Sequence, residues 1–341
     1  MQTLIEAVQR NCDIADANHA GDDSLCIYLL KMRDFYRWHE SHPLNVPVDR
    51  EVLGEWIIAR ESRWDDVEEQ SYESLVIDGR AYDVFDNANI NLALNSKGYV
   101  YSGGLGPRSR PMFFLAELVQ HQSDSAANIM VSDRELARCI IAPPGLSQQG
   151  GIYIRKDALR RYLGAMVEDW GWKQRPGPMN ELINHYQFLD DFDRAMGAMV
   201  ENEMENVILH EIGEQIAGEL IGEGWQVMLG NLDHPVKEFK ARAIRDNLAD
   251  CTATLPAFLT FDDHASIDFY YANMTPLRKK LFPSFCEAYE AARKKGGDYS
   301  RMKEVVKKGR LHWLKLGRRL VERDQQGDWD ALGLQLENSA F

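Results

Sequence analysis

The stretch Glu203-Met-Glu-Asn-Val-Ile-Leu-His210-Glu211-Ile-Gly-Glu214-Gln215 forms the centre of a predicted helix at about residues 191–222. At about 100° per residue, Glu203, His210 and Glu214 fall within roughly 60° of one another on one face. The rest of that face is apolar and consists of Met196, Met199, Val207, Ala217 and Ile221. A buried carboxylate is unfavourable unless it is paired, protonated or bound to a metal. Two carboxylates and an imidazole on such a face therefore indicate a candidate metal site.

The motif His210-Glu-Ile-Gly-Glu214 has the form HExxE. Its first and fifth residues lie one helical turn apart, so both can bind one cation. Glu211 lies about 100° round the helix, where a carboxylate can act on metal-bound water. One imidazole with several carboxylates is a harder donor set than two imidazoles and favours Fe or Mn over Zn. We therefore expect a divalent metal, namely Fe, Mn or Zn.

The HExxE helix resembles the HExxH helix of gluzincin-type metallohydrolases, with Glu214 in place of the second His. In that group a later helix supplies an acidic ligand, and an Asp four residues further on orients the first His. Asp246-Asn-Leu-Ala-Asp250 has the same spacing. The resemblance implies that His210, Glu214 and Asp246 bind the metal, that Glu211 is the general base, and that Asp250 orients His210. It also implies hydrolysis.

Two alternatives stay open. The spacing Glu203-x6-His210 resembles the first metal helix of haem-oxygenase-like di-iron oxygenases, in which Glu203 would also bind metal, although the sequence lacks their later His-x3-Asp-x2-His helix. The other alternative is that the glutamates are surface charges and His210 is a core histidine. Glycines at 213, 218 and 222 would then serve close helix packing, in a non-catalytic binding or assembly protein.

Charge is unevenly distributed along the chain, whose net charge is -14. Residues 278–323 contain 15 Lys and Arg against 5 Asp and Glu. This segment is either a basic surface for an acidic protein partner or a tail that neutralises the acidic body. A homo-oligomer is an open alternative. We expect a small-molecule or peptide substrate, and we expect neither a membrane nor a nucleic-acid partner, because acidic proteins bind nucleic acids through distinct basic modules.

Composition and cysteine use indicate a cytoplasmic protein. Of the 341 residues, 45% are hydrophobic and 27% are charged, as in soluble proteins. The five cysteines are scattered and form no CxxC pair, which is typical of a reducing compartment. The N-terminus lacks the basic and apolar regions of a signal peptide, and no apolar run is long enough to span a bilayer.

The hydrophobic pattern predicts an α+β fold that is mainly α. Helices are expected at about 2–20, 24–39, 47–61 and 85–95, with a hairpin over 73–84 that turns at Asp78-Gly79. Short strands at 99–101, 112–115 and 152–154 would form a small antiparallel sheet. Gly103-Gly-Leu-Gly106 lacks the context of a nucleotide-binding loop and is interpreted as a strand connection.

The Pro- and Gly-rich segment 143–151 suggests a boundary between two domains, 1–150 and 151–341. Helices are predicted beyond it at about 156–169, 179–189, 191–222 and 236–255, followed by the basic segment. The stretch Leu29-Leu-Lys-Met-Arg-Asp-Phe-Tyr-Arg-Trp38, with Cys12 upstream, resembles a bacterial family of uncharacterised proteins. Such a family implies no activity.

Overall fold

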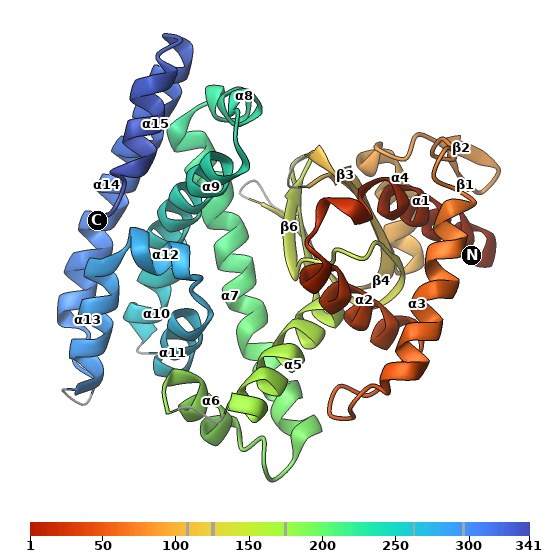
Figure 1. Ribbon diagram of the computed structural model, residues 1–341, viewed down its shortest axis with the longest axis horizontal. Helices are drawn as coiled ribbons and strands as arrows, with labels where there is room; N and C mark the ends of the chain where they lie inside the picture. The colour runs from red at the N-terminus through yellow and green to blue at the C-terminus, as the bar shows by residue number, and fades with distance from the viewer. Residues whose placement is uncertain (107–108, 124–126, 174–175, 262, 295–296) are drawn as a thin grey trace. The chain divides into compact units, whose positions relative to one another are not determined.

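The computed structural model describes residues 1–106, 109–123, 127–173, 176–261, 263–294 and 297–341 (Figure 1). The chain divides into two compact units, Met1–Trp172 and Lys173–Phe341. Helices dominate both units, and the first unit also contains one two-stranded antiparallel hairpin and a five-stranded sheet. The predicted α+β, mainly α fold class is therefore confirmed. Among the described residues, every helix is too short or too polar to cross a membrane.

The first unit begins with three helices, which lie close to where the periodicity predicted them. They are α1 (Gln2–His19), α2 (Leu25–His39) and α3 (Arg50–Asp65), with a short 3₁₀ turn η1 (Ala20–Asp22) after α1. Leu4, Val8 and Cys12 recur at helical spacing on α1 and are buried against the sheet. The carboxylate of Asp49 caps α3 by accepting hydrogen bonds from the backbone N–H groups of Glu51 and Val52.

A short hairpin and a helix lead into the main sheet. Strands β1 (Leu75–Ile77) and β2 (Arg80–Tyr82) pair antiparallel across Asp78 and Gly79. Both turn residues have positive φ, 53° and 78°, as a type I′ turn requires, so the predicted hairpin is confirmed. Helix α4 (Asn87–Leu94) and the 3₁₀ turn η2 (Asn95–Lys97) follow.

The main sheet has five strands in the order β3-β4-β5-β7-β6, and its curled shape is visible in Figure 1. All neighbours are antiparallel except β5 and β7, which are parallel. Helix α5 (Lys156–Lys173) follows the sheet. The strands are β3 (Tyr99–Leu105), β4 (Pro111–Ser123), β5 (Asn128–Arg138), β6 (Gly145–Gln148) and β7 (Gly151–Arg155).

The sheet is larger than the sequence predicted, since strands β5 and β6 were not expected. β5 is hard to recognise because it buries Ser132 and Glu135 among its apolar residues, which hides the usual alternation. Gly103, expected in a loop, lies within β3. A Cβ atom at this position would lie 2.2 Å from the carbonyl oxygen of Val84, so the strand requires glycine there.

A buried ion network joins the sheet to α5. The carboxylate of Glu135 on β5 accepts hydrogen bonds from Arg155 on β7 at 2.6 Å and from Arg161 on α5 at 2.8 Å. The neighbouring Arg138 donates to Asp34 on α2 at 2.7 Å. The side chain of Glu135 has no exposed surface, so these guanidinium groups must offset its loss of hydration.

We expect Glu135→Gln to destabilise the first unit by about 3–5 kcal/mol, because Arg155 and Arg161 lose the buried carboxylate that they share. Urea unfolding followed by circular dichroism measures the change. Glu117 provides a matched control, since it pairs with Arg134 on the surface of the same sheet. Glu117→Gln should cost less than about 1 kcal/mol. Equal shifts in the two variants would contradict a stabilising role for the buried network.

The second unit is helical throughout its described residues. Its core contains Trp313 and Leu320 from the long C-terminal helix α14, Trp225 and Leu248 from other helices, and Phe282 from the turn between α12 and α13. The helices are α6 (Pro178–Tyr186), α7 (Phe192–Ile221), α8 (Gly224–Asn231), α9 (Pro235–Ala249), α10 (Leu255–Phe261), α11 (His264–Asn273), α12 (Pro276–Leu281), α13 (Pro283–Lys294), α14 (Ser300–Gln325) and α15 (Trp329–Glu337).

Helices α7 and α9 approach each other closely at one point. A Cβ atom on Gly213 of α7 would lie only 2.6 Å from the carbonyl oxygen of Ala249, the last residue of α9. Glycine is therefore what allows the two backbones to come so near. Directly after Ala249 the chain widens into a π-helical turn, η4 (Asp250–Thr254), before α10. Such turns are often found at functional sites.

Candidate metal centre

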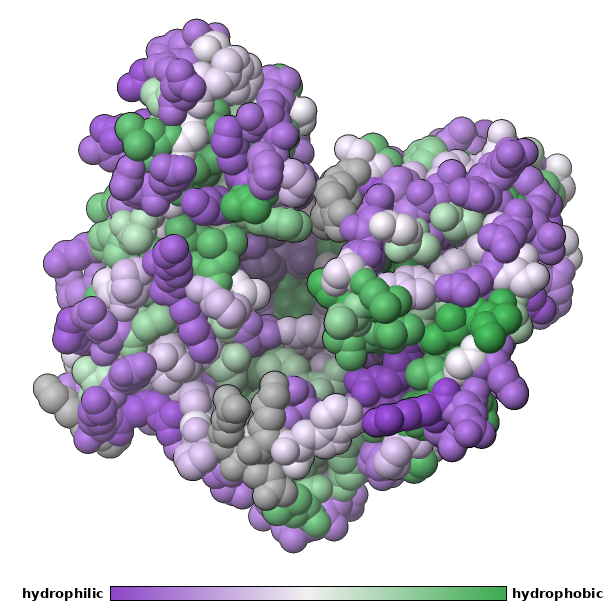
Figure 2. All heavy atoms as spheres, in the orientation of Figure 1, coloured by the Kyte–Doolittle hydropathy of each residue, from purple (hydrophilic) through white to green (hydrophobic). Residues whose placement is uncertain are grey.

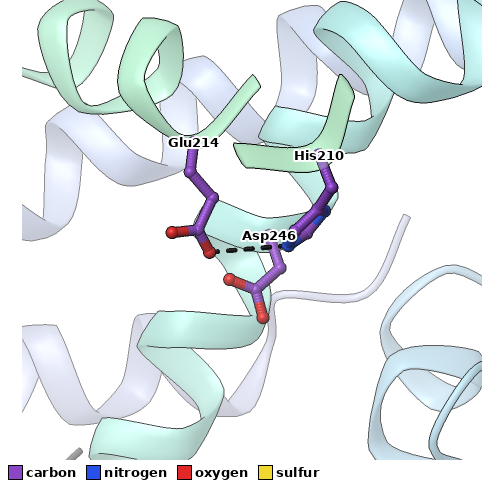
Figure 3. Close-up of side chains that lie close together, drawn as sticks. All are labelled: His210, Glu214 and Asp246. Atoms are coloured by element: carbon purple, nitrogen blue, oxygen red, sulfur yellow. Dashed lines mark ion pairs between the residues drawn. The ribbon is translucent and has the colours of Figure 1, made fainter. Parts of the chain in front are cut away.

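Three side chains that could hold a metal ion converge beside the contact between α7 and α9 (Figure 3). His210 and Glu214 lie one turn apart on α7, and Asp246 reaches toward them from α9. One ligand atom from each of these residues lies within 4.8 Å of the other two. Within the described part of the chain, this is the one group of three or more His, Cys, Asp or Glu residues with this geometry.

The three side chains are accessible from solvent. Nε2 of His210 lies 3.6 Å from Oε1 of Glu214, the contact marked in Figure 3, and the two side chains are 30% and 18% exposed. The side chain of Asp246 is 28% exposed. A hydrated cation can therefore reach these atoms without unfolding the unit.

The other nitrogen of His210 is held by Asp250, the first residue of the π-helical turn. Nδ1 of His210 lies 2.7 Å from Oδ1 of Asp250 and donates a hydrogen bond to it. This contact orients the ring and leaves Nε2 facing Glu214. The second oxygen of Asp250 accepts hydrogen bonds from the hydroxyl of Tyr270 at 2.9 Å and from Arg278.

Arg278 and Arg245 belong to the site, although sequence reasoning did not find them. Arg278 lies in the basic segment 278–323, but it points inward to Asp250 and also donates to Oδ1 of Asn247 at 3.0 and 3.1 Å. Arg245 lies 2.7 Å from Oε2 of Glu214. Neither arginine has a sequence spacing that relates it to the HExxE motif. The one sequence feature that could have indicated Arg245 is its position directly before Asp246, a predicted metal ligand.

These contacts shift the pKa values of the site. Although burial favours the neutral imidazole, Asp250 and Glu214 raise the pKa of His210 well above its usual range. Burial would raise the pKa of Glu214, but His210 and Arg245 lower it. Burial and the nearby charge of Glu214 raise the pKa of Asp246. Asp250 is also buried, yet Arg278 and His210 keep its pKa well below the usual range of a carboxylate.

The structure places the other two predicted residues differently. Glu211, the predicted base, is buried on α7, and its charge contributes to raising the pKa of Arg245. Glu203 lies outside the three-residue group. Its carboxylate accepts hydrogen bonds from the amide nitrogens of Asn206 at 2.7 Å and Asn202 at 3.5 Å. Both amides also donate to the hydroxyl of Ser266 on α11.

The surroundings of Glu203 favour a protonated carboxyl group. The residue is fully buried, and the side chains that donate hydrogen bonds to it, Asn202 and Asn206, are neutral amides. Burial raises the pKa of Glu203 to about 8, while the hydrogen bonds from the two asparagines act in the opposite direction. Glu203 therefore contributes to the packing of α7 against α11 chiefly as a neutral group near pH 7.

We expect the contribution of Glu203 to stability to decrease as pH rises from about 4.5 to about 8. In this window the folded state binds a proton that the unfolded state has released, so the free energy of unfolding decreases by up to about 4 kcal/mol. In Glu203→Gln this contribution should be absent. Urea unfolding at pH 5 and pH 9 compares the variant with the wild type. Glu205→Gln, on the exposed side of the same helix, should retain the wild-type profile. Parallel profiles for wild type and Glu203→Gln would contradict this assignment.

Family models match nearly the whole chain. A model described as "Family of unknown function (DUF6866) N-terminal domain" matches residues 3–155, and the corresponding C-terminal domain matches residues 160–337. An uncharacterised family was expected from residues 29–38, and this much is confirmed. The family matches do not show the expected resemblance to gluzincin-type metallohydrolases. No curated protein and no solved structure matches the chain.

Proposed function

Because the chain belongs to the DUF6866 family, whose description gives no activity, we propose its function from the site itself. The proposed function is that of a divalent-metal-dependent hydrolase. His210, Glu214 and Asp246 would bind the ion, and Glu211 would be the general base. The observation that carries the proposal is the convergence of three ligand atoms from two helices within 4.8 Å of one another. A single group of this size fits one ion, so the proposal is for a mononuclear site.

The orientation of His210 supports metal binding. Histidines that bind metals usually donate their second ring N–H to a carboxylate or a carbonyl, which fixes the tautomer that leaves the other nitrogen free. Asp250 supplies this contact at 2.7 Å, and Asp250 is itself held by Tyr270 and Arg278. A solitary core histidine does not need such a chain of buried polar partners.

The repulsion between two carboxylates supports cation binding. Glu214 and Asp246 each place one oxygen in the group of converging ligand atoms. The charge of Glu214 contributes to raising the pKa of Asp246. Partly buried carboxylates repel one another unless a cation lies between them. A divalent ion bound by both would relieve this repulsion.

The donor set also limits the metal and suggests its chemistry. One imidazole and two carboxylates form an oxygen-rich set, which suits Mn²⁺ or Fe²⁺ better than Zn²⁺. Three protein ligands leave coordination positions free, and a metal bound there supplies a Lewis acid that lowers the pKa of water. Glu211 follows His210 directly and is buried, so we assign it to accept the proton from water.

Elemental analysis of the purified protein tests the metal site. We expect about one equivalent of Mn, Fe or Zn per chain in the wild type, because three protein ligands hold one ion. His210→Ala and Asp246→Asn should lose it. Glu219→Gln, on the exposed surface of the same helix, should keep it. A metal-free wild type from cells supplied with these metals would contradict the proposal.

Glu211→Gln separates catalysis from metal binding. The variant should retain the metal but lose hydrolysis of an ester, amide and phosphoester panel by about a hundredfold or more, the usual contribution of a general base. Wild-type turnover that survives in Glu211→Gln would exclude Glu211 as the base. A wild type that binds metal but hydrolyses none of these substrates would support the site without the proposed reaction.

Arg245 should weaken metal binding, so Arg245→Gln should bind Mn²⁺ at least about tenfold more tightly in calorimetry. A guanidinium close enough to contact a ligand carboxylate would repel a divalent ion by several kcal/mol, even at an effective dielectric constant of about 20. The contact that orients Glu214 contributes less, about 1.4–2.8 kcal/mol. Arg242→Gln is the control, because Arg242 pairs with Glu238 on the same helix. Weaker binding by Arg245→Gln would mean that orientation of Glu214 dominates.

A further inference from the structure

Helix α2 of the first unit exposes apolar side chains over its first two turns. Leu25 is 70% exposed, Leu30 is 58% exposed and Ile27 is 49% exposed. Further along the same helix, Met32 and Phe35 are buried. Figure 2 shows apolar side chains gathered over α2. Contiguous apolar surface of this kind marks interaction sites more often than scattered exposed leucines do.

A groove of about 510 Å³ runs beside this apolar face. Leu25 and Tyr28 of α2 line one side of it, and Trp64 of α3 lines another. Tyr28 donates a hydrogen bond to Glu61 on α3 at 2.7 Å, and this bond links the two helices that line the groove. Leu29 lies one turn after Leu25, so the exposed face of α2 continues beyond the groove.

The groove is acidic. Asp23, Glu61, Asp65 and Glu68 line it, whereas no lysine or arginine is among the described residues that do so. Asp23 pairs with Lys31 at 2.6 Å. Residues 61–73 contain six Asp and Glu residues and a single Arg. The surface therefore combines an apolar stripe with an excess of negative charge along one side.

We infer that this surface docks a basic amphipathic helix of a partner protein. An apolar stripe on such a helix would cover Leu25 and Leu29, while its Lys and Arg residues would meet Asp65 and Glu68. The negative charge of this surface favours a basic partner. The same surface on a second copy of this chain would bring acidic groups against acidic groups, and nucleic acids and anionic membranes would be repelled. The groove therefore adds to the proposed catalytic function a binding function that does not depend on the metal.

A synthetic 18-residue helix with a leucine stripe and a lysine face is the probe, and fluorescence anisotropy with the full chain measures its binding. We expect it to bind at least about tenfold more tightly than a peptide of the same composition without the stripe. The double variants Leu25→Ser/Leu29→Ser and Asp65→Asn/Glu68→Gln should each weaken binding by about tenfold or more. Leu92→Ser should bind as the wild type does, because Leu92 is an exposed leucine on α4.

Two further readouts belong to the same experiment. Raising NaCl from 50 to 500 mM is expected to weaken binding, because the acidic groups contribute through exposed charges. Cys26 is exposed on α2, so the bound peptide should slow its reaction with a maleimide. Equal binding of both peptides, or wild-type affinity in Leu25→Ser/Leu29→Ser, would overturn the inference. A dimer that this double variant dissociates would also overturn it, because a second copy would then occupy the surface.

Discussion

The close approach of α7 and α9 at Gly213 is the constraint on which the candidate metal centre depends. Gly213 has no Cβ atom, and a Cβ atom at this position would lie 2.6 Å from the carbonyl oxygen of Ala249. With the two backbones this near, side chains as short as Asp246 and Asp250 reach His210 from the neighbouring helix. A larger residue at 213 would force the two backbones apart, because a Cβ atom cannot lie 2.6 Å from a backbone oxygen.

The contacts from His210 through Asp250 to Arg278 offset the free-energy cost of burying the carboxylate of Asp250. Asp250 is 2% exposed, and an unpaired carboxylate there would be strongly destabilising. His210, Tyr270 and Arg278 share its two oxygens, so the carboxylate is stabilised and the imidazole is oriented by the same contacts. Arg278 comes from the basic segment, and at least this one charge of that segment is used inside the second unit.

Helical periodicity accounts for the part of the site that could be predicted. His210 and Glu214 lie one turn apart, as do Asp246 and Asp250, and each pair can be read from spacing alone. Periodicity cannot tell how far along a stripe a site extends. Glu203 shares the stripe but lies two turns, about 10 Å, from His210 and is linked to Ser266 of α11 through Asn206 instead. Arg245 and Arg278 carry no pattern that relates them to the motif, and β5 was missed because its buried face contains Glu135.

Both units bury charged groups, and solvent access separates a structural network from a candidate ligand site. Around Glu135, the guanidinium groups of Arg138, Arg155 and Arg161 face the carboxylates of Glu135, Asp34 and Asp157 in equal number. The side chain of Glu135 has no exposed surface, so its charge is offset from within the fold. In the second unit, ligand atoms of His210, Glu214 and Asp246 converge where solvent can reach them. A cation can enter only such an accessible group, so the convergence of ligand atoms together with their exposure is the argument for a metal.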